Sequence, residues 1–139
     1  MNLLQLSALS LTLVIVPVSA QTVQFDIQSI QHNQGKLYIQ LYKGKQSYKS
    51  NKPYSATIVK AKEGTVSVKF SDIEAGDYAI RYFHDENNNG SMDTNLFGLP
   101  VEGYGFSNNA IVNFGPPSYE QMSFKVAQQP VKTHSTINY

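Results

Sequence analysis

Apolar and polar residues alternate along most of the chain after residue 20. Between Thr22 and Ile30 apolar side chains take every second position, and the same pattern returns over Lys36–Lys43. A period of two is typical of a strand with one buried and one solvated face. The turn residues Asn33-Gln34-Gly35 separate the two segments, which predicts an antiparallel hairpin.

Four further segments downstream follow the same rule. After an expected loop over Gly44–Ser55, the short strand 56–61 and the strand 65–71 flank the turn Lys62-Glu63-Gly64, which predicts a second hairpin. Ile73, Tyr78, Ile80 and Tyr82 are expected to share one buried row, with a bend at residues 75–77 between the end of one strand and the start of the next. Alternation returns once more over Met122–Val126.

These elements predict an all-β fold, an antiparallel β-sandwich of about seven strands with one long ordered loop. The segment Ile73-x-Ala75-Gly76-x-Tyr78-x-Ile80 is similar to transthyretin-like and carboxypeptidase-regulatory-like sandwiches. We expect a single domain over residues 21–127. Residues 128–139 contain Pro130 and mostly polar side chains, which predicts a frayed C-terminal tail.

Residues 1–20 have the features of a signal peptide. They contain no charged side chain, are mostly apolar, and end in the small-x-small sequence Val18-Ser19-Ala20. We therefore expect cleavage before Gln21, a periplasmic or extracellular location, and no stable membrane insertion after cleavage. A retained membrane anchor is the less favoured alternative, because the apolar run is short.

The amino-acid composition excludes several classes of site and of ligand. The chain has no cysteine, so disulfides, thiolate metal sites and thiol catalysis are excluded. Eleven basic and ten acidic residues give a net charge of +1. The chain therefore lacks the excess of basic residues that binds nucleic acid or an anionic membrane. We expect a monomer that binds no nucleic acid.

A long loop follows the predicted strand that contains Tyr78, Ile80 and Tyr82, where alternation stops between Phe83 and Ser118. It begins with the pattern D-x-N-x-N-G-x-x-D, in which oxygen-bearing side chains take the first, third, fifth and ninth positions of a calcium loop and glycine the sixth. The expected calcium ligands are the side chains of four residues and one backbone carbonyl, namely Asp85, Asn87, Asn89 and Asp93, with the carbonyl of Ser91.

The twelfth position carries Leu96 where an EF-hand has a bidentate Glu. The pattern therefore indicates a helix-free calcium loop of low affinity, whose missing ligand comes from Asp77, Glu86 or Glu102. The alternative is a turn without metal, since Asp, Asn and Gly also favour turns for conformational reasons.

The same segment carries a longer motif. The run F-H-D-E-N-N-N-G-x-M-D-T-N-x-F-G-x-P-x-E-G-Y-G-F-S-N-N-A, followed by F-G-P-P-S-Y, is similar to the exported bacterial family called domain of unknown function 2141. The resemblance extends from about Gly76 to Phe124. It implies export and a β-sandwich, and it implies no reaction.

Aromatic residues stand among glycines and prolines in this loop and allow two interpretations. Tyr104, Phe106, Phe114 and Tyr119 form a platform for a glycan or protein ligand, with Asn108 and Asn109 beside it, or they pack the loop onto the sandwich. In the second case the two asparagines satisfy backbone groups of the loop.

The sequence favours a non-enzymatic exported domain with calcium as its cofactor and an envelope protein or glycan as its partner. Two alternatives stay open: a small hydrolase with a site around His84 and Ser107, and a purely structural domain without metal.

Overall fold

The computed structural model describes residues 19–139 of the chain. The strands are β1 (Gln21–Ile30), β2 (Lys36–Lys43), β3 (Ser55–Lys60), β4 (Gly64–Ile73), β5 (Gly76–Asp85), β6 (Tyr104–Phe106), β7 (Phe124–Val126) and β8 (Val131–Thr136). The short helical segments are α1 (Gly44–Lys49), the 3-10 turn η1 (Ser107–Asn109) and α2 (Tyr119–Met122). Residues 1–18, which hold most of the predicted signal peptide, lie outside the described part. No helix in residues 19–139 is both long and apolar enough to cross a membrane.

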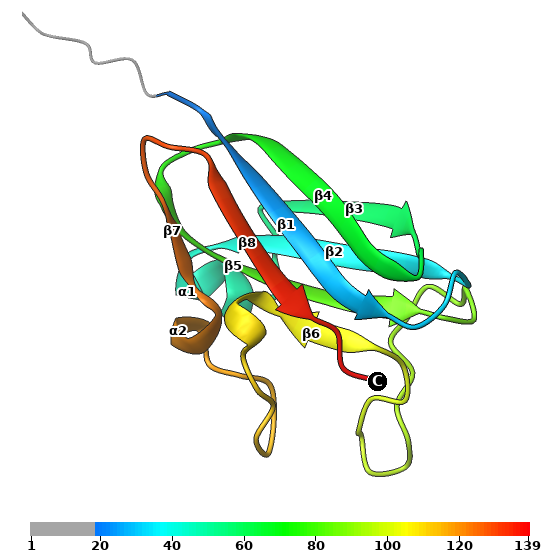
Figure 1. The fold of residues 1–139 in the computed structure, drawn as a ribbon. Coiled ribbons are helices and arrows are strands. Elements are labelled where there is room, and N and C mark those ends of the chain that lie inside the picture. Colours follow the sequence, from blue (N-terminus) through cyan, green and yellow to red (C-terminus); the bar gives the residue numbers. More distant parts are fainter. Residues whose placement is uncertain (1–18) are drawn as a thin grey trace, which may run out of the picture.

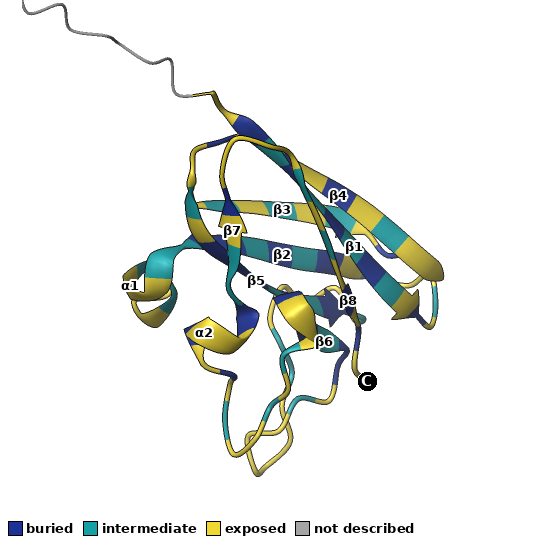
Figure 2. Ribbon diagram, turned by 60° about the vertical axis from the view of Figure 1, so that its left-hand side comes forward, coloured by how far each residue is buried: buried dark blue, intermediate teal, exposed yellow. Residues whose placement is uncertain are grey.

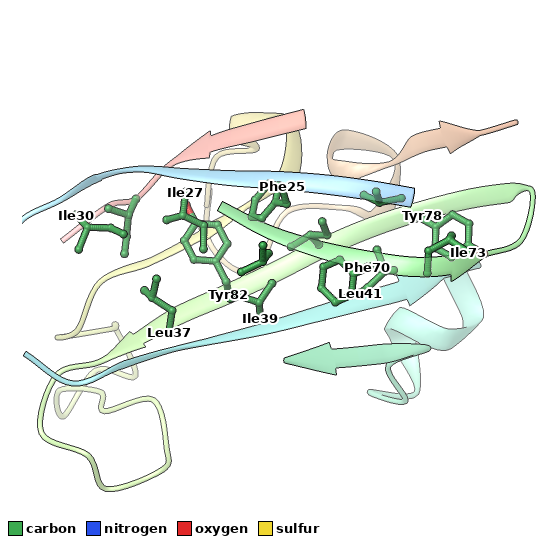
Figure 3. Close-up of a cluster of buried hydrophobic side chains, with 14 of the residues drawn as sticks. Phe25, Ile27, Ile30, Leu37, Ile39, Leu41, Phe70, Ile73, Tyr78 and Tyr82 are labelled. Carbon is green, nitrogen blue, oxygen red and sulfur yellow. The ribbon is translucent and has the colours of Figure 1, made fainter. Parts of the chain in front are cut away.

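The strands form two sheets, which confirms the all-β prediction. One sheet has the order β4-β1-β8, and the other has the order β3-β2-β5-β6, with β7 also paired to β5 (Figure 1). The side chains of Phe25, Ile39 and Tyr82 lie between the two sheets among the apolar residues of one continuous core (Figure 3). Alternate residues of β1 and β2 point into this core, because side chains of a strand project to opposite faces in turn.

Both predicted hairpins are wrong, although most of the residues predicted to lie in strands do so. β1 and β2 belong to opposite sheets, as do β3 and β4. The alternation determines which face of a strand is buried, but it carries no information about the neighbouring strand. The turn after β1 therefore carries the chain across the core. The left-handed backbone at Ser29 (φ 64°) lies at a register irregularity just before this turn.

The C-terminal tail is ordered, contrary to the prediction of fraying. β8 pairs with β1 over Val131–Thr136 in parallel, so the sandwich is not purely antiparallel. The inward positions of β8 carry Val131, Thr133 and the fully buried Ser135, so two of the three are polar and the strand lacks the apolar alternation by which we recognised the others. Ile137, directly after it, joins the core.

Two short helices cover one end of the outer face of the five-stranded sheet. α1 occupies part of the predicted loop 44–55, and α2 includes Met122, which the alternation had placed in a strand. Tyr119 and Met122 pack there against Ala79 of β5. Figure 2 shows α1 and α2 on this side of the molecule, with the long loops projecting beside them. These loops border the part of the outer face that β2, β5 and β6 form.

Candidate functional cleft

Two rows of side chains cross the outer face of the five-stranded sheet. Strand pairing places Tyr38, Phe83 and Tyr104 in one row. The second row contains Gln40, Arg81 and Phe106. Directly opposite residues of paired strands lie close enough for their side chains to touch. Strands β2, β5 and β6 thus present a floor that is aromatic on one side and carries a cation and an amide on the other.

Two loops turn this floor into a cleft. The loop 86–103 joins β5 to β6, and the segment 110–118 leads from η1 to α2. Both project from the same side of the molecule (Figure 1). They enclose a cleft of about 480 Å³ together with the floor. Its lining from the loops comprises Gly90, Ser91, Met92, Gly98, Leu99, Pro100, Val112, Gly115 and Pro116.

Arg81, the single arginine of the chain, is fixed on the floor by neutral acceptors. Its Nη2 donates to Gln40 Oε1 at 2.6 Å, to Tyr42 Oη at 2.6 Å and to Asn51 Oδ1 at 2.7 Å. Burial raises the pKa of the Tyr42 hydroxyl, and the nearby guanidinium opposes this shift. No carboxylate within residues 19–139 forms an ion pair with Arg81. The positive charge on the cleft floor is therefore uncompensated.

Two of the four predicted binding residues line the cleft, namely Tyr104 and Phe106. The other two lie outside it and satisfy backbone groups, as the packing interpretation expects. Asn108 Nδ2 donates to the carbonyl of Ser123, and Asn109 Oδ1 accepts from the backbone of Thr136.

The remaining aromatic candidates differ from one another. Tyr119 is buried on the sheet, where its hydroxyl donates to the carbonyl of Asp77 at 2.7 Å. Phe114 is fully exposed at the end of the second loop. Of these two residues, Tyr119 packs the segment onto the sandwich and Phe114 contributes an apolar tip.

The predicted calcium loop is built around Asp85, which is fully buried at the end of β5. One of its carboxylate oxygens accepts the backbone N–H of Asn89, and the other accepts that of Gly90. The positive φ of Gly90, 82°, provides the sharp bend that returns the chain to Asp85. The first and sixth positions of the motif are thus joined directly.

Asp93 lies on the open side of the same loop. Its carboxylate accepts hydrogen bonds from the side-chain amides of Asn87 and Asn89 at 2.5–3.0 Å. The side-chain oxygen of Asn89 accepts the backbone N–H of Ser91. The five predicted ligand residues therefore form one connected group.

Of the three candidates for the missing ligand, Glu102 lies against the loop. Its two carboxylate oxygens accept the backbone N–H groups of Glu86 and Asp93. Asp77 lies at the opposite end of β5. Glu86 points to His32 and to the backbone of Gly103. Glu102 therefore joins the start of the loop to its middle, a connection over 16 residues that spacing alone does not reveal.

The structure separates His84 from Ser107, the two residues of the hydrolase alternative. Ser107 Oγ is buried, accepts the backbone N–H of Ile80 and donates to the carbonyl of Met122. Ile80 precedes His84 by four residues on β5, which corresponds to roughly 13 Å along a strand. The two side chains therefore do not form a nucleophile–base pair.

Sequence reasoning missed Gln40, Arg81 and Phe83. They occupy the positions that alternation assigns to the solvated face of a strand, where polar residues are normal. The available signal was Tyr38 and Phe83, two aromatic rings on a nominally wet face. Their rings stack at a centroid distance of 4.9 Å. Aromatic side chains on the outer face of a sheet indicate that something covers it.

One of the comparisons with known proteins found a match. No curated protein and no solved structure matches the chain. The sequence model of a bacterial family described as an uncharacterised protein conserved in bacteria, DUF2141, matches residues 25–134. This range begins within β1 and ends within β8, so it contains the cleft floor and both loops. The chain therefore belongs to the DUF2141 family.

Proposed function

We propose that this protein is an exported, non-enzymatic binding domain whose cleft holds an apolar segment of a partner protein through a carboxylate. The observation that carries this proposal is Arg81 on the floor of an otherwise largely apolar cleft. A guanidinium presents five N–H donors in a fixed plane and matches carboxylate geometry. Its Nε and Nη2 atoms are engaged by the protein, and Nη1 makes no hydrogen bond within residues 19–139.

The cleft walls indicate the rest of the ligand. Phe83 and Tyr104 offer aromatic surface beside Arg81, and Leu99 and Pro100 add aliphatic surface from the first loop. Ligand sites generally combine such apolar walls with a few polar groups that fix orientation. A peptide with an acidic side chain or a free C-terminus between apolar residues would satisfy both requirements.

Exposed apolar residues around the cleft favour a protein over a glycan. The two loops carry six large apolar side chains that are more than half exposed, namely Leu96, Phe97, Leu99, Val101, Ile111 and Phe114. Clusters of exposed apolar side chains are characteristic of surfaces that bind proteins. Four of these six side chains are aliphatic and offer a sugar no ring to stack on, whereas aromatic rings such as Tyr104 do stack on sugars.

Calcium is the second part of the proposal, as the ion that stiffens the loop 86–103. Each oxygen of Asp85 accepts one backbone N–H, and a carboxylate oxygen has capacity for more than one partner. Asp93 offers a second carboxylate on the same loop. Hard oxygen donors of this kind suit Ca²⁺, and the small number of carboxylates suits the weak affinities of extracellular sites.

The proposal that the protein is exported rests on the sequence of residues 1–20. The proposal that it is not an enzyme rests on the site. His84 and Ser107 serve the fold, and the cleft floor carries an arginine and an amide without a neighbouring nucleophile–base pair among the described residues. The purely structural alternative leaves the uncompensated charge of Arg81 and the six exposed apolar side chains unexplained.

A selection experiment tests the cleft. A displayed library of random peptides is selected against the purified protein, and the recovered peptides are titrated against the wild type, Arg81→Gln and Phe83→Ala. The matched control is Ile58→Ser, because Ile58 is exposed on β3 and does not line the cleft. We expect carboxylate-containing apolar peptides whose affinity falls at least tenfold in both cleft variants and is unchanged in the control.

Two outcomes would count against the proposal. Peptides that bind Arg81→Gln as tightly as the wild type would remove Arg81 from recognition. Binding of glycans from an array, lost in Phe83→Ala, together with no peptide enrichment, would retain the cleft and replace the protein partner by a sugar.

A further inference from the structure

Two of the three histidines of the chain meet a glutamate beside the loop 86–103. His32 lies in the turn after β1, His84 lies near the end of β5, and Glu86 follows β5 directly. One potential ligand atom from each residue lies within 4.8 Å of the others. We propose that His32, His84 and Glu86 bind a divalent transition-metal ion, best represented by Zn²⁺, that fastens the turn after β1 to the start of the loop.

Hydrogen bonds assign the tautomer of His84. Its Nε2 lies 2.5 Å from the carbonyl oxygen of Gln34, and a carbonyl can only accept, so Nε2 carries the proton. The lone pair is therefore on Nδ1, which accepts from the hydroxyl of Tyr139 at 2.7 Å. A histidine that donates one ring N–H to a backbone carbonyl and offers the other nitrogen is the usual arrangement around a bound metal.

His32 provides an independent observation. Its Nε2 lies 2.6 Å from Glu86 Oε1, and a carboxylate oxygen accepts, so Nε2 carries a proton and the neutral ring has its lone pair on Nδ1. That Nδ1 atom is buried and has no hydrogen-bond partner within residues 19–139. It is the sole buried side-chain nitrogen or oxygen atom of the described part in this condition. A buried acceptor without a donor is unfavourable, and coordination of a cation removes that cost.

The donor set selects the class of metal. Two imidazole nitrogens and one carboxylate oxygen suit Zn²⁺ and similar borderline ions, whereas Ca²⁺ prefers oxygen ligands alone. Tetrahedral coordination at bond lengths of about 2.0–2.1 Å requires ligand atoms about 3.3 Å apart, so the site closes by a small movement. His32 can supply that movement because it lies in an irregular turn and its side chain is 35% exposed.

Metal binding would change two contacts. The hydrogen bond between His32 Nε2 and Glu86 Oε1 loosens when His32 Nδ1 and the Glu86 carboxylate coordinate the ion, and Nε2 keeps its proton. The hydroxyl of Tyr139 leaves His84 Nδ1 when that atom becomes a ligand. Glu86 directly follows Asp85, so the site joins the turn after β1 to the loop that forms one wall of the cleft.

Zinc titration by calorimetry tests the site in the purified protein without a histidine tag, in buffer containing excess calcium. We expect one equivalent of Zn²⁺ to bind, and Co²⁺ to give the visible absorption of a four-coordinate nitrogen–oxygen site. His32→Ala and Glu86→Gln should each weaken Zn²⁺ binding at least tenfold. His134→Ala is the matched control, because His134 is exposed on β8, and it should bind Zn²⁺ like the wild type.

The opposite results would overturn the inference. These are no binding of Zn²⁺, equal affinity in His32→Ala and the wild type, or loss of binding in His134→Ala. Unfolding curves establish that His32→Ala and Glu86→Gln are folded at the titration temperature, and Glu86→Gln keeps the shape of the side chain. No peptide takes part in these titrations, so failure of the proposed cleft function leaves this test intact.

Discussion

The hydroxyl of Tyr82 donates a hydrogen bond to the hydroxyl of Ser135 at 2.9 Å in the buried space between the two sheets. Tyr82 belongs to the five-stranded sheet, and Ser135 belongs to the C-terminal strand of the other sheet. Burial raises the pKa of Tyr82 well above its usual range. This polar contact within an apolar core connects β8 to the strand that carries Arg81.

Removal of the Ser135 hydroxyl should therefore leave a buried donor without an acceptor. We expect Ser135→Ala to lower the free energy of unfolding by about 1–3 kcal/mol. Addition of Tyr82→Phe should recover most of this loss, because it removes the unpaired donor. Urea unfolding of both single variants and the double variant measures the coupling, and strictly additive losses would contradict the proposed hydrogen bond.

Ile137 provides the sharpest test of whether the C-terminal segment is ordered. It is 5% exposed in the core, whereas Ile111 is 70% exposed, so the pair offers the same substitution in two environments. Ile137→Ala should lower the free energy of unfolding by about 2–4 kcal/mol. Ile111→Ala should change it by less than about 0.5 kcal/mol. Equal effects in urea unfolding would show that the segment is frayed.

The sequence was sufficient to predict the strands whose inward residues are apolar. It was insufficient to predict which strands pair with one another. Val23, Phe25 and Ile27 predicted β1 and its buried face. The pairing of β1 with β4 and β8 depends on contacts between segments far apart in the chain, which alternation does not encode. β8 was missed because its fully buried inward residue, Ser135, is polar and is stabilised by Tyr82, a partner 53 residues away.

The candidate site was predictable only within residues 83–118. Tyr104 and Phe106 stood out in the sequence because they interrupt a glycine-rich segment. Arg81 and Gln40 occupy ordinary solvated strand positions, and their significance comes from β6 and the loops that surround them. Glu102 joins the metal-loop candidates through backbone contacts that no spacing rule contains.

Substitution of Ser107 tests whether its buried hydroxyl has a structural rather than a catalytic role. Ser107→Ala removes the acceptor of the Ile80 N–H and should lower the free energy of unfolding by about 1–3 kcal/mol. The matched control is Ser71→Ala on the exposed face of β4, which should change stability by less than about 0.5 kcal/mol. Chemical denaturation of the two variants makes the comparison. A silent Ser107→Ala would mean that the hydroxyl does not secure η1 to β5.

Calcium should stabilise the native protein through the loop 86–103. A ligand that binds only the native state at ten times its Kd adds about 1.4 kcal/mol, which corresponds to a rise of a few degrees in Tm. We expect this rise in thermal unfolding when chelator is replaced by millimolar calcium, and its loss in Asp93→Asn. Asp93 is preferred to Asp85 for substitution because it lies on the open side of the loop.

The matched control for calcium is Asp72→Asn, which removes an exposed carboxylate at the end of β4. This variant should retain the full increase in Tm with calcium. An equal increase in Asp93→Asn and the wild type would place the ion elsewhere. The same Tm in calcium and in chelator would leave an Asn-rich turn held by its own hydrogen bonds.

The most direct test of the binding cleft is a map of the bound surface by amide chemical shifts. Isotopically labelled protein is titrated with a carboxylate-containing apolar peptide obtained by selection. The account predicts shift changes concentrated at Arg81, Phe83, Leu99 and Tyr104, and no change at Ile58. Changes confined to β3 or to β8, with the cleft floor unaffected, would contradict it.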